Sequence, residues 1–340
     1  PFPCIDPAGY YLTGIPDDVR DLLDEAYQNG ARIHNDSWGG GAFGVYDSTS
    51  QQFDDFVYRH PDMTIVVSAG NSGVDGDLDG YVDENSITSP ATSKNLISMG
   101  ASESERSTGG YQYTWGEAWP MDYWADPTKS DKVSDSREEL AAFSSRGPLQ
   151  DGRIKPDVVA PGTNIISARS SQITSNGWGP YDAYYMFMGG TSMASPMGTG
   201  TAALVHDYYV KGQGHLNPSA ALIKATLINT AVDIQGYGNP GEEAGQPIPN
   251  HHEGWGRIDL DAATRLTGRQ FVDEGNGITT GETLVYRYYV RPEKPFKTTL
   301  VWSDYPASPG ASKALVNDLN LRVVAPDGTA YWGNNFRGGW

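Results

Sequence analysis

The stretch GGTSMASP, from Gly189 to Pro196, decides how this sequence is interpreted. Two glycines and a Thr-Ser pair stand directly before small and apolar residues, which predicts that a helix begins here with Ser192 at its N-terminus. Serine at such a place usually caps the helix, but the same place also suits a nucleophile. The glycines favour a nucleophile, because they let a ligand approach the backbone. The free N–H groups of a helix N-terminus would also stabilise an oxyanion.

A second stretch, VVSAGNSG at residues 66–73, places Asn71 directly after an apolar run and between two glycines. Asparagine in a glycine-rich loop is most often a plain turn residue. The alternative is that the Asn71 side-chain amide donates a hydrogen bond to an oxyanion. The residue types alone leave both interpretations of Asn71 open.

Helical and strand patterns alternate along most of the chain. Helical spacing of apolar residues predicts helices at 17–30, 53–60, 190–210 and 218–231. Short apolar runs predict strands within 31–40, 63–73, 95–102 and 155–168. This alternation predicts an α/β fold whose parallel sheet is covered by helices on both faces. The polar segment 103–140, rich in Trp and Tyr, is interpreted as a long surface insertion.

The pattern changes near residue 268. Three segments, at 282–292, 296–304 and 320–333, alternate like half-exposed strands and are separated by Pro and Asp-Gly turns. They predict a smaller antiparallel β domain over 269–340, with too few strands to close a β-sandwich. The α/β domain is accordingly assigned to residues 1–268.

Composition excludes several classes of partner. The chain has 24 Lys and Arg against 42 Asp and Glu, a formal net charge of −18, which argues against nucleic acid and against an anionic membrane. It has no apolar stretch long enough to span a membrane. Its single cysteine, Cys4, excludes an internal disulfide. The first residues, PFPCIDPAGYY, show no signal peptide, and we expect the chain to be the interior of a longer precursor.

Five motifs together resemble one family. In chain order they are NDSWGG, SAGNSG, AAFSSRGP, KPDVVAPGT and GGTSMASP. They are similar to the catalytic second half of the subtilisin-like serine proteases (subtilases, peptidase family S8), whose fold is a three-layer α/β/α sandwich, and the resemblance covers about residues 17–265. The later stretches TTLVWSD, LVNDLNL and APDGTAYWGN resemble the C-terminal β domain of alkaline subtilases of the KP-43 type.

The resemblance implies a secreted serine endopeptidase that cleaves extended polypeptides through an acyl-enzyme. It implies that Ser192 is the nucleophile and that Asn71 and the Ser192 backbone N–H form the oxyanion hole. Two short segments would form the walls of the S1 pocket, which holds the substrate side chain before the cleaved bond: Ser37, Trp38 and Gly39 on one side, and Ser68, Ala69 and Gly70 on the other. The alternative is a subtilase-derived binding or assembly module that no longer cuts.

The sequence also departs from the family. Its Asp-Thr/Ser-Gly and His-Gly-Thr-His motifs, which carry the catalytic Asp and His, are absent, and none of the six histidines has the required context. His206 beside Asp207 is no substitute, because adjacent helical residues lie on different faces. We therefore expect the catalytic Asp and His on a missing N-terminal segment of the same precursor, and we expect this chain alone to be inert.

The acidic stretch DGDLDGYVDE at residues 75–84 has the spacing of a calcium loop. Oxygen ligands at alternate positions, with a glycine for the sharp turn, suit six- to eight-coordinate Ca²⁺. The predicted ligands are Asp75, Asp77, Asp79, Asp83 and the Tyr81 carbonyl, and the alternative is a flexible acidic loop. By resemblance alone, a second set in the β domain could bind calcium or simply form turns: Asp304, Asn317 and Asp318.

Overall fold

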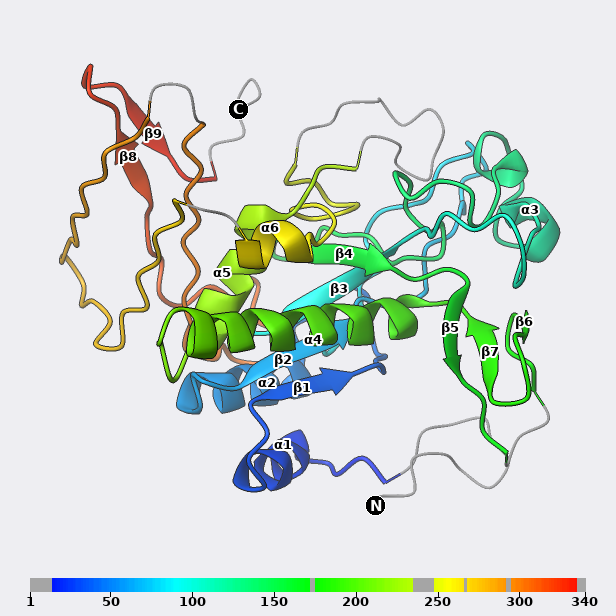
Figure 1. The fold of residues 1–340 in the computed structure, drawn as a ribbon, viewed down its shortest axis with the longest axis horizontal. Helices are drawn as coiled ribbons and strands as arrows, with labels where there is room; N and C mark the ends of the chain where they lie inside the picture. Colours follow the sequence, from blue (N-terminus) through cyan, green and yellow to red (C-terminus); the bar gives the residue numbers. More distant parts are fainter. Residues whose placement is uncertain (1–13, 172–174, 235–247, 266–267, 292–294, 335–340) are drawn as a thin grey trace.

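The computed structural model describes residues 14–171, 175–234, 248–265, 268–291 and 295–334. Its centre is a parallel sheet of four strands in the order β1-β2-β3-β4 (Figure 1). The strands are β1 (Ile33–Asp36), β2 (Thr64–Ser68), β3 (Ile97–Ser102) and β4 (Val158–Pro161). The helices are α1 (Val19–Gln28), α2 (Ser48–Arg59), α3 (Trp115–Ala118), α4 (Thr191–Asp207), α5 (Ala220–Thr230) and α6 (Leu260–Arg265), with short turns of 3-10 helix at Thr128–Ser130 and π-helix at Tyr208–Gly212.

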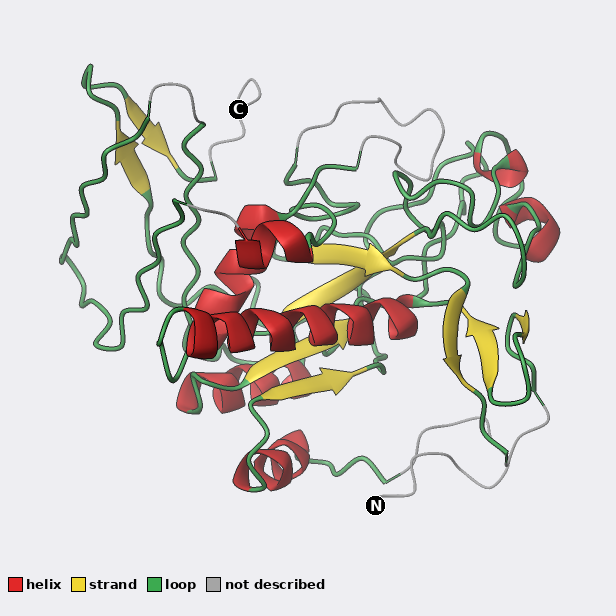
Figure 2. Ribbon diagram, in the orientation of Figure 1, coloured by secondary structure: helices red, strands yellow, loops and turns green. Residues whose placement is uncertain are grey.

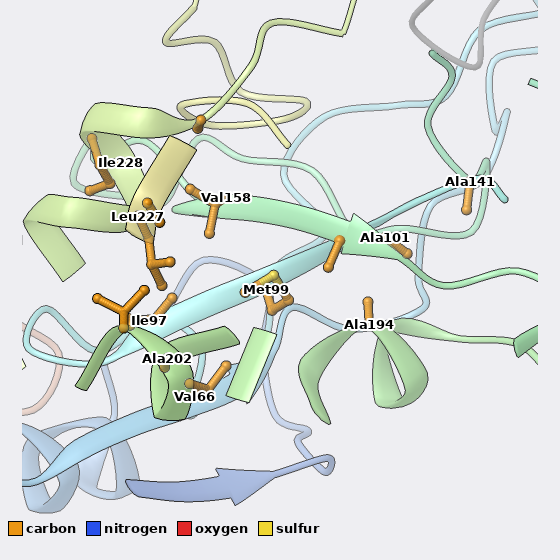
Figure 3. Packing of buried hydrophobic residues seen from close by; sticks show 14 of the residues in the cluster. Val66, Ile97, Met99, Ala101, Ala141, Val158, Ala194, Ala202, Leu227 and Ile228 are labelled. Carbon is orange, nitrogen blue, oxygen red and sulfur yellow. The ribbon is translucent and has the colours of Figure 1, made fainter. Parts of the chain in front are cut away.

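Helices cover both faces of the sheet, as the sequence predicts. All residues of β2 and β3 are buried, because a parallel sheet between two helical layers has no solvated face. Val66 and Met99 face the layer that contains α4, where they pack with Ala194 and Ala202 (Figure 3). The next residue of β2, Val67, points to the other face and packs in the cluster that contains α1 and α2. The three-layer α/β/α architecture is therefore confirmed.

The small residues of α4 allow this helix to lie very close to the sheet. A side chain at Gly198 would overlap the end of the Met99 side chain. Helix α4 contacts all four strands of the parallel sheet, so its N-terminus has a fixed position beyond their carboxyl ends.

The segment 103–140 is only partly a surface insertion. Figure 2 shows that it is mostly loop, but Trp115, Tyr123 and Val133 are almost completely buried in the same core cluster as Val66. The Trp115 ring packs edge-on against Phe143, with ring centroids 5.6 Å apart. The expectation of a long surface insertion was wrong for these buried residues, whose side chains point inward and extend the core.

Two small antiparallel sheets complete the fold (Figure 2). The first joins β5 (Ile165–Ala168), β7 (Tyr185–Met188) and β6 (Gly179–Pro180), in the order β5-β7-β6. The second pairs β8 (Arg322–Val324) with β9 (Ala330–Trp332) across an Asp-Gly turn. Within 268–291 and 295–334 this is the only regular strand pair, so a β-sandwich over 269–340 and the boundary at 268 stay predictions.

Part of this C-terminal segment is anchored to the α/β domain. The Lys94 ammonium group lies 2.6 Å from the Asp304 carboxylate, and both side chains are buried. The Asp304 carboxylate also accepts hydrogen bonds from the backbone N–H groups of Val316 and Asn317. Its oxygens are thus occupied by a lysine and by turn N–H groups, which favours the turn interpretation of Asp304 and Asn317 over a calcium site.

Candidate active site

Ser192 does not cap the helix on which it lies. Gly190 is the N-cap of α4, and the cap has no side-chain hydrogen bond. Gly190 has a φ of 138°, a backbone conformation open to glycine and costly for other residues. Ser192 is therefore the second residue of the helix, with its hydroxyl available for another role.

Two reciprocal hydrogen bonds join Ser192 to the end of β1. The Ser192 hydroxyl donates to the Ser37 carbonyl at 3.2 Å, and the Ser37 hydroxyl donates to the Ser192 carbonyl at 3.1 Å. The second bond follows from Pro196. Proline has no N–H group, so the carbonyl four residues earlier in the helix, that of Ser192, lacks its usual helical partner. The Ser37 hydroxyl takes the place of that missing N–H group.

Asn71 follows β2 and lies at the same end of α4. Its Oδ1 accepts hydrogen bonds from both the backbone N–H and the hydroxyl of Thr191, each at 2.8 Å. These two bonds fix which end of the amide faces Thr191, and they leave Nδ2 as the free donor. A Cβ atom on Gly190 would lie 3.4 Å from Asn71 Nδ2 and 3.6 Å from the Ser192 backbone nitrogen. Asn71 Oδ1 lies 3.6 Å from the same point, so the Asn71 amide and the Ser192 backbone nitrogen are close together beside Gly190.

The two predicted pocket walls both lie close to the Thr88 side chain. A Cβ atom on Gly39 would lie 3.4 Å from the Thr88 hydroxyl oxygen, and one on Gly70 would lie 3.6 Å from the same atom. Gly70 also faces the Ser145 hydroxyl, at 2.7 Å from such a Cβ atom. Sequence reasoning missed both residues: Thr88 lies in no motif, and Ser145 lies in the AAFSSRGP motif but was given no role.

The other predicted wall residues are fixed by contacts with the rest of the fold. Trp38 donates its indole N–H to the Asp36 carboxylate at 2.8 Å and packs against Phe53. Ser68 ends β2, and Ala69 donates its backbone N–H to the Met99 carbonyl at 2.9 Å. Both Ser68 and Ala69 are buried, so the second wall is a rigid continuation of the sheet.

No histidine among the described residues reaches the Ser192 hydroxyl, whose only hydrogen bond there goes to Ser37. His34 lies 3.3 Å from Asp36, and His215 lies 2.7 Å from Asp273. Asp207 pairs with Lys211 at 2.7 Å rather than with the adjacent His206. These contacts give Ser192 no general base from within the described ranges.

The acidic loop brings three of its predicted ligands together. Carboxylate oxygens of Asp75, Asp77 and Asp79 all lie within 4.8 Å of one another. Asp75 is only 2% exposed, and its Oδ1 is buried without a hydrogen-bond partner. Burial, together with the negative charge of Asp79, raises the pKa of Asp75. An orphaned buried oxygen among hard oxygen donors fits a bound Ca²⁺ ion. The Asp83 carboxylate does not join this group and instead accepts the Gly76 N–H at 2.8 Å.

A second acidic cluster was not predicted. Carboxylate oxygens of Glu103, Asp131 and Glu139 lie within 4.8 Å of one another. Glu103 is completely buried and accepts the Trp115 indole N–H at 3.1 Å. Burial, followed by the nearby carboxylates, raises the pKa of Glu103 well above its usual range and the pKa of Asp131 to about 7.

Together these observations define an α/β protein in which the carboxyl ends of parallel strands face a serine-bearing helix N-terminus. The chain belongs to the subtilase family of serine proteases, because the Subtilase family profile (Peptidase S8) matches residues 14–256. Its resemblance to the KP-43 type in particular stays a prediction.

The chain is similar to several known proteins. The serine protease/ABC transporter B family protein tagD of Dictyostelium discoideum is 26% identical over 91% of this chain and 22% of its own length. Serine protease AprX of Bacillus subtilis is 33% identical over 42% of this chain and 26% of its own length. The prenylagaramide maturation protease PagA superimposes on 75% of this chain and 68% of its own, with 19% identity and a TM-score of 0.48. The chain spans about a fifth of the length of tagD. In the part of the chain that the structure describes, no helix combines the length and the apolar character needed to cross a membrane.

Proposed function

We propose that Ser192 is the nucleophile of a serine endopeptidase and that Asn71 stabilises the oxyanion. The proximity of the Asn71 amide and the Ser192 backbone nitrogen, both beside Gly190, carries this proposal. A general base takes the proton of Ser192 Oγ as this oxygen attacks the carbonyl carbon of the cleaved bond, and the two donors stabilise the negative charge that forms on the carbonyl oxygen. The protonated base gives this proton to the leaving amine. Water, deprotonated by the same base, then hydrolyses the acyl group, and the proton returns to Ser192 Oγ.

The substrate is an extended polypeptide that pairs with the backbone of Ser37, Trp38 and Gly39. This segment directly follows strand β1, and an exposed extended backbone can bind a peptide by strand pairing. One substrate side chain lies between Gly39 and Gly70, beside Thr88. The alternative of an inactive binding module has no observation of its own in its favour.

The general base has to come from outside the described residues, and an open face of α4 supports this. On one side of the helix Met197 is 46% exposed and Leu204 is 52% exposed. Pro196, Gly200 and Ala203 lie on the same exposed side, at the spacing of a single helical stripe. Among the described residues, strand β1 beside it pairs with β2 alone. We propose that the segment of the precursor that carries the catalytic Asp and His covers this stripe.

Secretion and bound calcium belong to the same proposal. A relative that is 36% identical over 35% of this chain is the minor extracellular protease Vpr of Bacillus subtilis. We propose that Asp75, Asp77, Asp79 and the Tyr81 carbonyl, joined by Asp83 once the ion is present, hold a structural Ca²⁺ ion. The bound ion would neutralise the acidic loop, whose mutual repulsion otherwise favours an open conformation.

Replacing Asn71 by alanine in the full-length protein is expected to lower kcat by about a hundred- to a thousandfold. The KM should change little, because the donor acts mainly on the charge that develops in the transition state. Peptide hydrolysis by purified wild-type and variant protein measures both constants. Ser72→Ala, in the same loop, serves as the control and should leave kcat unchanged. An Asn71→Ala variant with wild-type kcat would remove Asn71 from the oxyanion hole.

Chelation of calcium is expected to lower the melting temperature of the full-length protein. A ligand that binds only the folded state stabilises it by about 2.7 kcal/mol at a hundred times its Kd. Asp75→Asn should remove most of the difference between melting curves recorded in Ca²⁺ and in excess chelator. The control is Asp24→Asn, an exposed residue of α1, which should keep the full difference. Identical melting temperatures of the wild-type protein in both buffers would rule out this site.

A further inference from the structure

Asn35 connects the strand that leads into the proposed substrate-binding segment to the helix that carries Ser192. Its Oδ1 accepts a hydrogen bond from the Ser195 hydroxyl at 2.8 Å and lies 2.9 Å from the Thr199 hydroxyl oxygen. Both hydroxyls belong to α4, one turn apart. The other end of the same amide, Nδ2, donates to the Ser37 hydroxyl at 3.0 Å. One side chain of β1 thus contacts α4 at two points and also directs Ser37.

The amide determines where the Ser37 proton goes. A hydroxyl has one proton to donate. Because Asn35 Nδ2 donates to Ser37, the Ser37 hydroxyl is free to donate its own proton to the Ser192 carbonyl. That carbonyl is the one left without a helical N–H by Pro196. The chain of contacts therefore runs from α4 through Asn35 and Ser37 back to the backbone of Ser192.

We propose that Asn35 is a positioning residue, which sets the distance between the attacking oxygen of Ser192 and the substrate bound along Ser37–Gly39. This inference rests on the proposed role of Ser192. Its physical basis is that one amide contacts two successive turns of α4 and also the Ser37 hydroxyl. These side-chain contacts hold the end of β1 against α4 and so fix Ser37 beside Ser192.

The test compares full-length variants by the kcat and KM of peptide hydrolysis. Rates are normalised to the number of sites that react with a fluorophosphonate probe, and melting temperature is recorded in parallel. Asn35→Ala is expected to lower kcat by about ten- to a hundredfold per reactive site, since a displacement of about 1 Å costs about a hundredfold. Thr201→Ala is the matched control on α4. The Thr201 hydroxyl donates only to the Met197 carbonyl within the same helix, so this variant should lose stability without losing kcat.

The Asn35→Asp variant distinguishes a positioning role of Asn35 from a packing role. Its carboxylate still accepts from Ser195 and Thr199, but it also accepts the Ser37 proton and so leaves the Ser192 carbonyl without a partner. We expect it to lose kcat as Asn35→Ala does. Ser37→Ala should have a similar effect, and Asn35→Ala combined with Ser37→Ala should be no worse than either alone, because the two residues act in series.

Three outcomes would overturn the inference. Wild-type kcat in Asn35→Asp would show that the amide donor is not needed. Additive losses in the double variant would show that Asn35 does not act through Ser37. A loss of melting temperature with unchanged kcat per reactive site would leave Asn35 a purely structural role. A wild-type protein in which Ser192 takes no probe would instead overturn the proposed function, and this inference with it.

Discussion

Replacing Ser192 by alanine in the full-length protein is expected to abolish covalent labelling by a fluorophosphonate probe and to lower kcat on the order of a millionfold. Alanine removes the only atom that can form the acyl-enzyme, while the oxyanion donors and the substrate-binding segment remain. The residual rate should therefore still exceed that of the uncatalysed reaction by about a thousand- to ten-thousandfold. Mass spectrometry of the labelled peptide and peptide hydrolysis measure the two effects.

The control for this experiment is Ser175→Ala, an exposed serine outside the site, which should be labelled and should cleave as the wild type does. Ser192→Ala should also keep the wild-type melting temperature within a small margin, because its hydroxyl makes one hydrogen bond, to the Ser37 carbonyl. Labelling that persists in Ser192→Ala would assign the nucleophile to another residue. An unlabelled wild-type protein would favour the inactive binding module.

The layers of the fold could be predicted from the sequence because burial leaves a clear pattern. Strands β2 and β3 lie between two layers of helices, so nearly every residue in them is apolar or small. Helix α1 differs from these strands, because Val19 and Leu23 are its only buried residues. Their spacing gives the sequence of α1 a helical period. Local patterns of this kind are visible in a single sequence because they depend on neighbours along the chain.

The features that sequence reasoning missed depend on residues far apart in the chain. Gly190, rather than Ser192, is the N-cap of α4, because its positive φ places it just outside the helix. Trp115 lies in a polar segment but is buried against Phe143. In the sequence, Asn35 is one more polar residue of a strand. Its role follows from its contacts with three hydroxyl groups that lie near it only in the folded protein. Contacts of this kind have no spacing that a pattern could show.

Residues 1–340 expressed alone are expected to show no labelling of Ser192 above the level of Ser192→Ala, whereas the full-length protein is labelled. A serine hydroxyl is a weak nucleophile until a base within hydrogen-bond reach removes its proton. The described residues place no histidine there, since the Ser192 hydroxyl donates to the Ser37 carbonyl. Labelling of the isolated chain at the full-length rate would show that a base lies within it, and the proposed contribution from the rest of the precursor would then be wrong.

The exposed stripe of α4 allows an independent test of the proposal that the rest of the precursor supplies the general base. Met197 is 46% exposed on this stripe, and Met121, in the 103–140 segment, is 74% exposed. If the remainder of the precursor covers α4, Met197 should be oxidised by peroxide in residues 1–340 and protected in the full-length protein, because oxidation follows exposure of the sulfur. Met121 should react equally in both and serves as the internal control. Equal oxidation of Met197 in the two proteins would show that the stripe stays open, and the catalytic Asp and His would then have to reach Ser192 without packing on α4.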